Sequence, residues 1–171
     1  MTLGGISGFE LSQVNIARLL APLDSAPLAD FVAALDPVNA AADRAPGFRW
    51  RLRTEDGDAT AVRVFDDEWL LLNMSTWASH QELVDYVYGA DHVAVLRERR
   101  RWFARPVEAM AVLWWVPAGH RPTAAEAQER LVHLREHGPT PSAFTLRAVF
   151  PPPGAASVAP VVDLPLGCGV D

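Results

Sequence analysis

The sequence predicts an α+β protein in which helices pack on one face of an antiparallel sheet. The predicted elements run strand, helix, strand hairpin, strand, helix, strand, then a further helix and strand. Half of the 171 residues are hydrophobic, which is enough for one sizeable core. Serine and threonine caps mark the points where helices begin. The series strand, helix, strand, strand, helix, strand is that of the ferredoxin-like fold.

The first predicted strand covers residues 9–19, because side chains alternate there so that the two faces differ. Ser25 followed by Pro27 then predicts the start of a helix, whose apolar residues recur at helical spacing. We expect Pro37 to interrupt or kink this helix before residues 39–43.

A hairpin follows, with strands at residues 48–54 and 60–65 on either side of a turn signal at residues 55–58. The alternation in the first of these strands places Phe48, Trp50 and Leu52 on one face and three arginines on the other. Residues 69–77 then form a strand that is apolar enough at its start to be covered on both faces.

The capping-box pattern from Ser79 to Glu82 starts the second helix. We expect this helix to break at Gly89 and to resume as far as Phe103. Residues 108–116 form the next strand, which runs into the turn Pro-Ala-Gly-His-Arg-Pro.

A second capping box at Thr123 starts the third helix, and Gly138 followed by a proline ends it. Residues 143–150 read as a last short strand. We therefore expect one domain over residues 1–150, with this C-terminal helix and strand as an extension, and an extended proline-rich tail over residues 151–171.

Charge and composition exclude several classes of protein. The net charge of −6 does not supply the basic surface that nucleic acid requires, so we expect no nucleic-acid partner. No apolar run approaches the roughly 18 residues of a membrane span, and no secretory leader is recognisable, so we expect a cytoplasmic protein with no membrane partner. The single cysteine, Cys168, allows neither a disulfide nor a cysteine cluster within one chain.

Many tryptophans lie on predicted strands, and their apolar area is too large to leave in water. A symmetric partner sheet would cover it, so we predict a homodimer. The tryptophans concerned are Trp50, Trp69, Trp77, Trp114 and Trp115.

Several separated blocks between residues 9 and 150 resemble a family of small bacterial proteins of unassigned function in the dimeric α/β-barrel superfamily. The blocks are QVNIARLLAPLDS, DPVNAAADRAPGFRWRL, LLNMSTWAS, VYGADHVAVLRERRRWF, LWWVPAGHRPTAAEA and HGPTPSAF. The stretch STWASHQELVDYVYGADH is also similar to antibiotic-biosynthesis and haem-degrading monooxygenases. In the haem-degrading group an asparagine, a tryptophan and a histidine line the pocket, and the resemblance places Asn15, Trp77 and His92 in comparable positions.

The candidate catalytic residues are His92, Asn15 and Asn73. The imidazole of His92 could transfer a proton or bind haem, and the alternative is a histidine that packs at the helix break. Asn15 and Asn73 could orient a substrate oxygen, or could instead bond to a neighbouring backbone. Gln13 shares a strand face with Asn15, and Ser75 and Trp77 share one with Asn73, so these three are candidate substrate-binding residues.

Trp114 and Trp115 point to opposite faces of their strand, so only one of them can line a pocket. His120 follows in the turn, where it could lie at the mouth of the pocket or simply be solvated. The arginines of residues 97–105 could bind an anionic substrate or a haem propionate, and the alternative is a solvated helix face. We expect no metal site, since the one pair of histidines four residues apart, His133 and His137, does not by itself predict one.

The resemblance, together with the candidate pocket residues, implies a monooxygenase-like enzyme of biosynthesis that acts on a small aromatic or polycyclic substrate in an apolar barrel pocket. The cofactor is either none or haem. Two alternatives stay open: a non-oxidative cyclase, isomerase or dehydratase that uses the same pocket, and a dimer that binds a ligand without catalysis.

Overall fold

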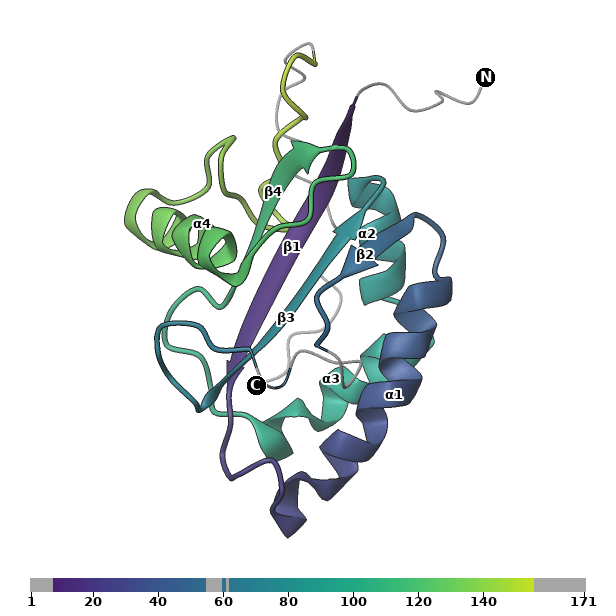
Figure 1. The fold of residues 1–171 in the computed structure, drawn as a ribbon, viewed down its shortest axis with the longest axis vertical. Coiled ribbons are helices and arrows are strands. Elements are labelled where there is room, and N and C mark those ends of the chain that lie inside the picture. Colours follow the sequence, from purple (N-terminus) through teal and green to yellow (C-terminus); the bar gives the residue numbers. More distant parts are fainter. Residues whose placement is uncertain (1–7, 55–59, 61, 156–171) are drawn as a thin grey trace.

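The computed structural model of the chain describes residues 8–54, 60 and 62–155. Its sheet has four strands in the order β2-β3-β1-β4, and every neighbouring pair is antiparallel (Figure 1). The prediction of an α+β, ferredoxin-like fold is therefore confirmed. The strands are β1 (Phe9–Arg18), β2 (Phe48–Arg51), β3 (Leu70–Trp77) and β4 (Ala111–Pro117).

Two of the three predicted caps are present where the helices begin, whereas Ser25 precedes η1 without a capping bond, because its hydroxyl donates to the Pro22 carbonyl oxygen. The Ser79 hydroxyl accepts a hydrogen bond from the Glu82 backbone N–H at 3.3 Å, and the Thr123 hydroxyl accepts one from the Glu126 N–H at 3.1 Å. Gly89 separates α2 from α3, as predicted. The helices are η1 (Ala26–Leu28), α1 (Ala29–Arg44), α2 (His80–Val87), α3 (Ala90–Trp102) and α4 (Ala124–His137).

The interruption predicted at Pro37 does not occur, because α1 continues through the proline to Arg44. Phe31 and Ala42 are buried on either side of Pro37, and the proline itself is exposed. Tertiary packing of the two halves thus outweighs the hydrogen bond that a proline removes from a helix.

The predicted hairpin is wrong in its second strand. Strand β2 pairs with β3, while residues 62–65 form no strand and Val64 makes a single bridge with Asp67. Phe65 and Asp66 have φ values of 53° and 50°, and this left-handed backbone cannot continue a strand. The turn predicted at residues 55–58 lies outside the described residues.

The strand predicted at residues 143–150 is also wrong. Only Phe144 pairs with the sheet, through two backbone hydrogen bonds to Leu113 of 2.8 and 2.9 Å. The Phe144 side chain is fully buried, so the segment turns inward to fill the core and does not extend along β4. Residues 151–155 form neither helix nor strand, and the rest of the predicted tail, with Cys168, lies outside the described residues.

The two faces of the sheet are covered by different helices, with α4 on the side opposite α1, α2 and α3 (Figure 1). The apolar cluster under α4 includes Val14, Met74, Val112, Trp114 and Leu131. The cluster under α2 includes Leu11, Trp77, Leu83, Leu113 and Phe144. A third cluster at the opposite end of the same face includes Leu19, Leu28, Phe31, Leu71 and Trp102.

This arrangement removes the reason for which a dimer was predicted. Trp77 and Trp114 are fully buried within one chain, since α2 and α4 supply the cover that a partner sheet was expected to supply. Trp69, by contrast, is 38% exposed. The homodimer stays a prediction that now depends on the resemblance alone. Among the described helices, none combines the length and apolar character that crossing a membrane requires.

Candidate functional site

A group of uncharged polar side chains lies at the centre of the sheet, on the face that α1, α2 and α3 cover. Gln13 lies directly opposite Ser75, and Asn15 lies directly opposite Asn73, in the pairing of β1 with β3. Residues two apart on a strand share a face, so all four side chains point to the same side. We call Gln13, Asn15, Asn73 and Ser75 the amide cluster.

Hydrogen bonds across the two strands hold the amide cluster together. The Gln13 amide nitrogen donates to the Ser75 hydroxyl at 2.8 Å and to the Asn73 carbonyl oxygen at 3.2 Å. The Asn15 amide nitrogen in turn contacts the Gln13 carbonyl oxygen at 3.4 Å. Every bond joins a donor to an acceptor of complementary type, so the four side chains have defined orientations.

The position of the amide cluster is unusual for a sheet face that helices cover. It lies between Leu11 of β1 and Leu19, which follows that strand, and on β3 between Trp77 and Leu71, all of which are buried. Ser75 is buried and Gln13 is half-buried, whereas Asn15 and Asn73 are exposed. The helices therefore leave the middle of this face open, and amide groups border the opening where core residues would otherwise pack.

Trp77 forms one wall beside the amide cluster. Its indole N–H donates to the Ser75 hydroxyl at 2.8 Å, and its ring is fully buried. The Tyr86 ring stacks on it, with centroids 4.9 Å apart and an angle of 29° between the planes. Sequence reasoning missed Tyr86, although its spacing of three residues from the buried Leu83 on the same helix was a usable signal.

His92 packs against Tyr86, and none of the hydrogen bonds described above for the amide cluster involves it. Its Nδ1–H donates to the Val87 carbonyl oxygen at 3.0 Å, which leaves Nε2 as an acceptor on the neutral ring. Burial lowers the pKa of His92, and the bond to Val87 opposes this with a smaller effect. The rings of His92 and Tyr86 are 5.1 Å apart, and Tyr86 in turn stacks on Trp77 beside the cluster.

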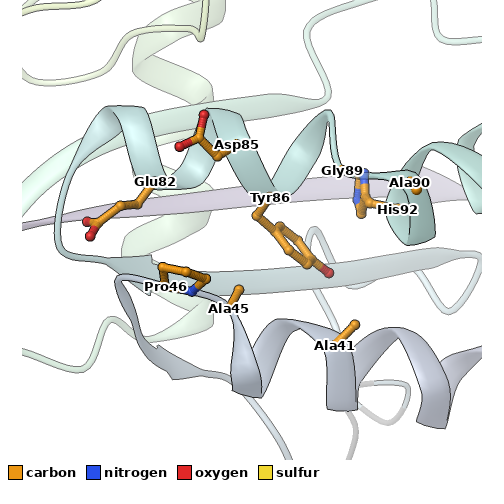
Figure 2. A pocket seen from close by; sticks show the side chains of 9 residues that line it. All are labelled: Ala41, Ala45, Pro46, Glu82, Asp85, Tyr86, Gly89, Ala90 and His92. Carbon is orange, nitrogen blue, oxygen red and sulfur yellow. The ribbon is translucent and has the colours of Figure 1, made fainter.

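A cavity of about 230 Å³ separates the end of α1 from α2 and α3 (Figure 2). It is smaller than the roughly 300 to 1,000 Å³ typical of sites for drug-sized ligands. No arginine lines it that could pair with a haem propionate, and the two acidic lining residues, Glu82 and Asp85, have carboxylates that accept hydrogen bonds from Ser79 and Gln81. The residues around His92 therefore do not fit haem. The lining residues are Ala41, Ala45, Pro46, Glu82, Asp85, Tyr86, Gly89, Ala90 and His92.

The arginine run of α3 does not line this cavity. Arg97, Arg99 and Arg100 are exposed, and so is Arg101, whose guanidinium lies 2.8 Å from the Glu98 carboxylate. This matches the alternative of a solvated helix face paired to nearby acids.

Arg51 is a charged neighbour of the amide cluster that sequence reasoning missed. It lies directly opposite Ser75 in the pairing of β2 with β3, and its side chain is 12% exposed. A register shift between Phe48 and Trp50 moves Arg51 to the helix-covered face, which the plain alternation of the strand does not predict. The guanidinium pairs with the Asp43 carboxylate of α1 through Nε at 2.8 Å and Nη2 at 3.3 Å.

Three other candidate residues have hydrogen-bond partners outside the amide cluster. Trp114 faces α4, where its indole N–H donates to the Glu126 carboxylate at 2.9 Å. The His120 Nε2 atom lies 2.8 Å from the same carboxylate, so His120 packs against the first turn of α4. Trp115 is on the helix-covered face, but its N–H donates to the Phe150 carbonyl oxygen at 2.8 Å. Of the two adjacent tryptophans, Trp115 therefore shares the face of the cluster.

No metal centre is found in the part of the chain that the structure describes, where no group of three or more His, Cys, Asp or Glu side chains could hold an ion. His133 and His137 stack with ring centroids 4.4 Å apart. The His133 Nε2 atom also lies 2.9 Å from the Thr140 hydroxyl, so this pair contributes to the packing at the end of α4.

Comparison with solved structures finds SnoaB, a cofactor-independent oxygenase from Streptomyces nogalater, at 17% identity and a TM-score of 0.42, covering 66% of this chain and 95% of that one. PA3566 from Pseudomonas aeruginosa matches at 10% identity and a TM-score of 0.46, covering 68% and 100%. A dabb family protein with a ferredoxin-like fold from Mesorhizobium loti matches at 16% identity and a TM-score of 0.40, covering 64% and 99%. These values are too low to carry an argument about function.

A search of curated proteins finds no match. A family model, by contrast, matches residues 10–160, which include the described helices, the amide cluster and the four strands except the first residue of β1. The chain belongs to the family described as Domain of unknown function (DUF3291).

Proposed function

We propose that this protein is a monooxygenase-like enzyme that binds a small aromatic or polycyclic molecule against the amide cluster. The observation that carries the proposal is the hydrogen-bonded set of Gln13, Asn15, Asn73 and Ser75 at the open centre of a sheet face. Amide donors held in place suit an oxygen that gains negative charge during a reaction. Tyr86, which is half-buried and stacks on the buried Trp77, suits contact with an aromatic ring.

The chemistry that fits this arrangement depends on an acidic substrate. Within the described residues, the hydrogen bonds of the amide cluster join uncharged side chains, so we assign the cluster no proton-abstracting group. An enolisable ketone can lose its acidic C–H proton to water. The amide cluster would then hold the oxygen of the resulting enolate. The enolate then reduces O2 at its ring carbon, and the hydroperoxide loses water to leave a second carbonyl group. The substrate supplies the electrons for this sequence.

His92 has an indirect part in this proposal. Its ring packs against Tyr86 at 5.1 Å and is held by the bond to Val87, so it would position Tyr86 as a wall of the site. Trp115 and His120 remain candidates for substrate contact from the sequence, and their hydrogen bonds to Phe150 and Glu126 favour packing roles.

Anthrone, an enolisable tricyclic ketone, provides the test. The purified protein is mixed with anthrone in air, and both oxygen uptake and anthraquinone absorbance are recorded. We expect Asn73→Ala and Gln13→Ala to lower the rate above background by about tenfold each, which corresponds to about 1.4 kcal/mol. Asn73→Ala removes an amide donor, and Gln13→Ala removes the bonds that orient Asn73 and Ser75. Gln81→Ala is the matched control, because Gln81 is an exposed amide bonded to Asp85 on α2.

The alternatives predict different results. Conversion of an aromatic ketone without oxygen uptake would indicate a cyclase, isomerase or dehydratase in the same pocket. Binding without any conversion would indicate a ligand-binding protein. A rate that is the same in the parent, Gln13→Ala and Asn73→Ala would remove the amide cluster from the function.

A further inference from the structure

Small residues surround the cavity between the end of α1 and the helices α2 and α3 (Figure 2). Ala41 and Ala45 line it from α1 and the residue that follows α1, and Gly89 and Ala90 line it from the junction of α2 with α3. None of these four residues has a side chain larger than a methyl group, so a volume of about 230 Å³ stays unfilled. That volume suits a molecule smaller than a drug-sized ligand.

Three of the polar side chains that line this cavity are hydrogen-bond acceptors. Glu82 and Asp85 contribute carboxylates, and each accepts a side-chain hydrogen bond, from Ser79 and Gln81 respectively. Within the described residues, neither carboxylate is paired with an arginine or a histidine. His92 adds the Nε2 atom of its neutral ring, because its Nδ1–H is already bonded to a backbone carbonyl oxygen.

The charges and the aromatic ring at this cavity favour an organic cation. Two carboxylates on the wall create a negative potential, which attracts a positively charged ligand. The Tyr86 side chain extends from α2 toward α1 and lines the same cavity (Figure 2), and the face of a phenol ring attracts organic cations. An ammonium group also carries N–H donors for the acceptors of the wall. A metal ion fits less well, because the described residues include no group of three or more side chains that could hold one.

We propose that this cavity binds a small organic ammonium ion, with its N–H groups toward the two carboxylates and its apolar part against Ala41, Ala45 and Pro46. No residue of the amide cluster lines the cavity, so this second ligand site goes beyond the proposed function. Tyr86 lies between the two places, since it lines the cavity and stacks on Trp77 beside the amide cluster.

Two probes with the same phenyl ring and different charge test the selectivity. Benzylammonium is the cation and benzyl alcohol is its neutral counterpart, and the binding of each is measured by titration calorimetry at pH 7.5. We expect the parent protein to bind benzylammonium about tenfold more tightly than benzyl alcohol, because hydrogen bonds between charged groups are the stronger ones. Asp85→Asn and Glu82→Gln should each weaken benzylammonium binding by about threefold and leave benzyl alcohol binding unchanged.

Ala41→Leu shows whether the probe binds in this cavity. The larger side chain occupies part of the volume, so we expect it to weaken benzylammonium binding by about tenfold or more. Ala94→Leu is the matched control, since Ala94 is an exposed alanine of α3 that does not line the cavity. Circular dichroism checks that each variant folds. Ala90→Leu repeats the test from the opposite wall if Ala41→Leu does not fold.

Several results would overturn the proposal. They are equal binding of the two probes by the parent, absence of benzylammonium binding, a preference that survives in both carboxylate variants, and unchanged benzylammonium binding in a folded cavity-filling variant. Weaker benzylammonium binding in Gln13→Ala would place the probe at the amide cluster and would overturn it as well. The anthrone assay reports on the amide cluster alone, so the proposed function and this inference fail independently.

Discussion

The indole of Trp77 stacks on the phenol ring of Tyr86, with centroids 4.9 Å apart, while its N–H donates to the Ser75 hydroxyl at 2.8 Å. One buried side chain therefore connects the amide cluster of the sheet with α2. The Phe48 ring packs against the same indole at 5.6 Å and near a right angle, which ties the start of β2 to this point.

Trp77→Phe should show how much of this depends on the indole N–H. The substitution keeps an aromatic ring but removes the hydrogen bond to Ser75 and some buried area, so we expect the free energy of unfolding to fall by about 1 to 3 kcal/mol. Urea unfolding measures the change. Trp69→Phe is the control, because Trp69 is 38% exposed and should cost less than about 1 kcal/mol. Equal effects of the two changes would contradict the central role of Trp77.

Glu126 should matter for stability and not for ligand binding. Its carboxylate accepts the hydrogen bond from the buried Trp114 indole, so Glu126→Ala leaves that N–H without a partner at a cost of about 1 to 3 kcal/mol. His120→Ala removes only a partly exposed contact to the same carboxylate and should cost less than about 1 kcal/mol. Thermal unfolding together with the anthrone assay tests both. Loss of the anthrone reaction in His120→Ala would show that His120 contributes to the binding site.

Acidification should destabilise the protein through two histidines. Burial lowers the pKa of both His80 and His92 below their ordinary value of 6.5. The unfolded chain then binds protons that the native chain does not, so stability falls as the pH drops below about 6.5 and levels off below the native pKa values. His80 also carries a buried Nε2 atom that has no hydrogen-bond partner.

Unfolding midpoints in urea at pH 7.5 and pH 5.5 measure this effect. We expect the loss of stability between the two pH values to be smaller in His80→Gln and in His92→Gln than in the parent. The exposed His137 provides the control variant His137→Gln. The same pH dependence in the parent and in all variants would show that neither buried histidine controls the acid response.

A homodimer remains our prediction for the oligomeric state, and sedimentation equilibrium tests it. A dimer should have twice the 18.7 kDa mass of one chain. Because each chain covers both faces of its own sheet, we expect dilution to dissociate the dimer without unfolding the monomer. A single species of one-chain mass at all concentrations would contradict the prediction.

Local signals in the sequence determined much of this structure. The caps at Ser79 and Thr123 set the starts of α2 and α4, because a capping side chain bonds to backbone only three residues away. The two-residue period likewise placed Gln13 beside Asn15 and Asn73 beside Ser75, since side chains on a strand alternate between its faces.

Tertiary structure decided what these local signals could not. A shift in register between β2 and β3 moved Arg51 beside the amide cluster, and packing of α4 on the opposite face assigned Trp114 and His120 to a different cluster. Because Phe144 is buried in the core, residues 143–150 do not form the predicted strand. The left-handed backbone of Phe65 and Asp66 likewise prevents the strand predicted at residues 60–65. Each outcome depends on contacts between residues far apart in the chain, whose free energy exceeds the local preference of any one segment.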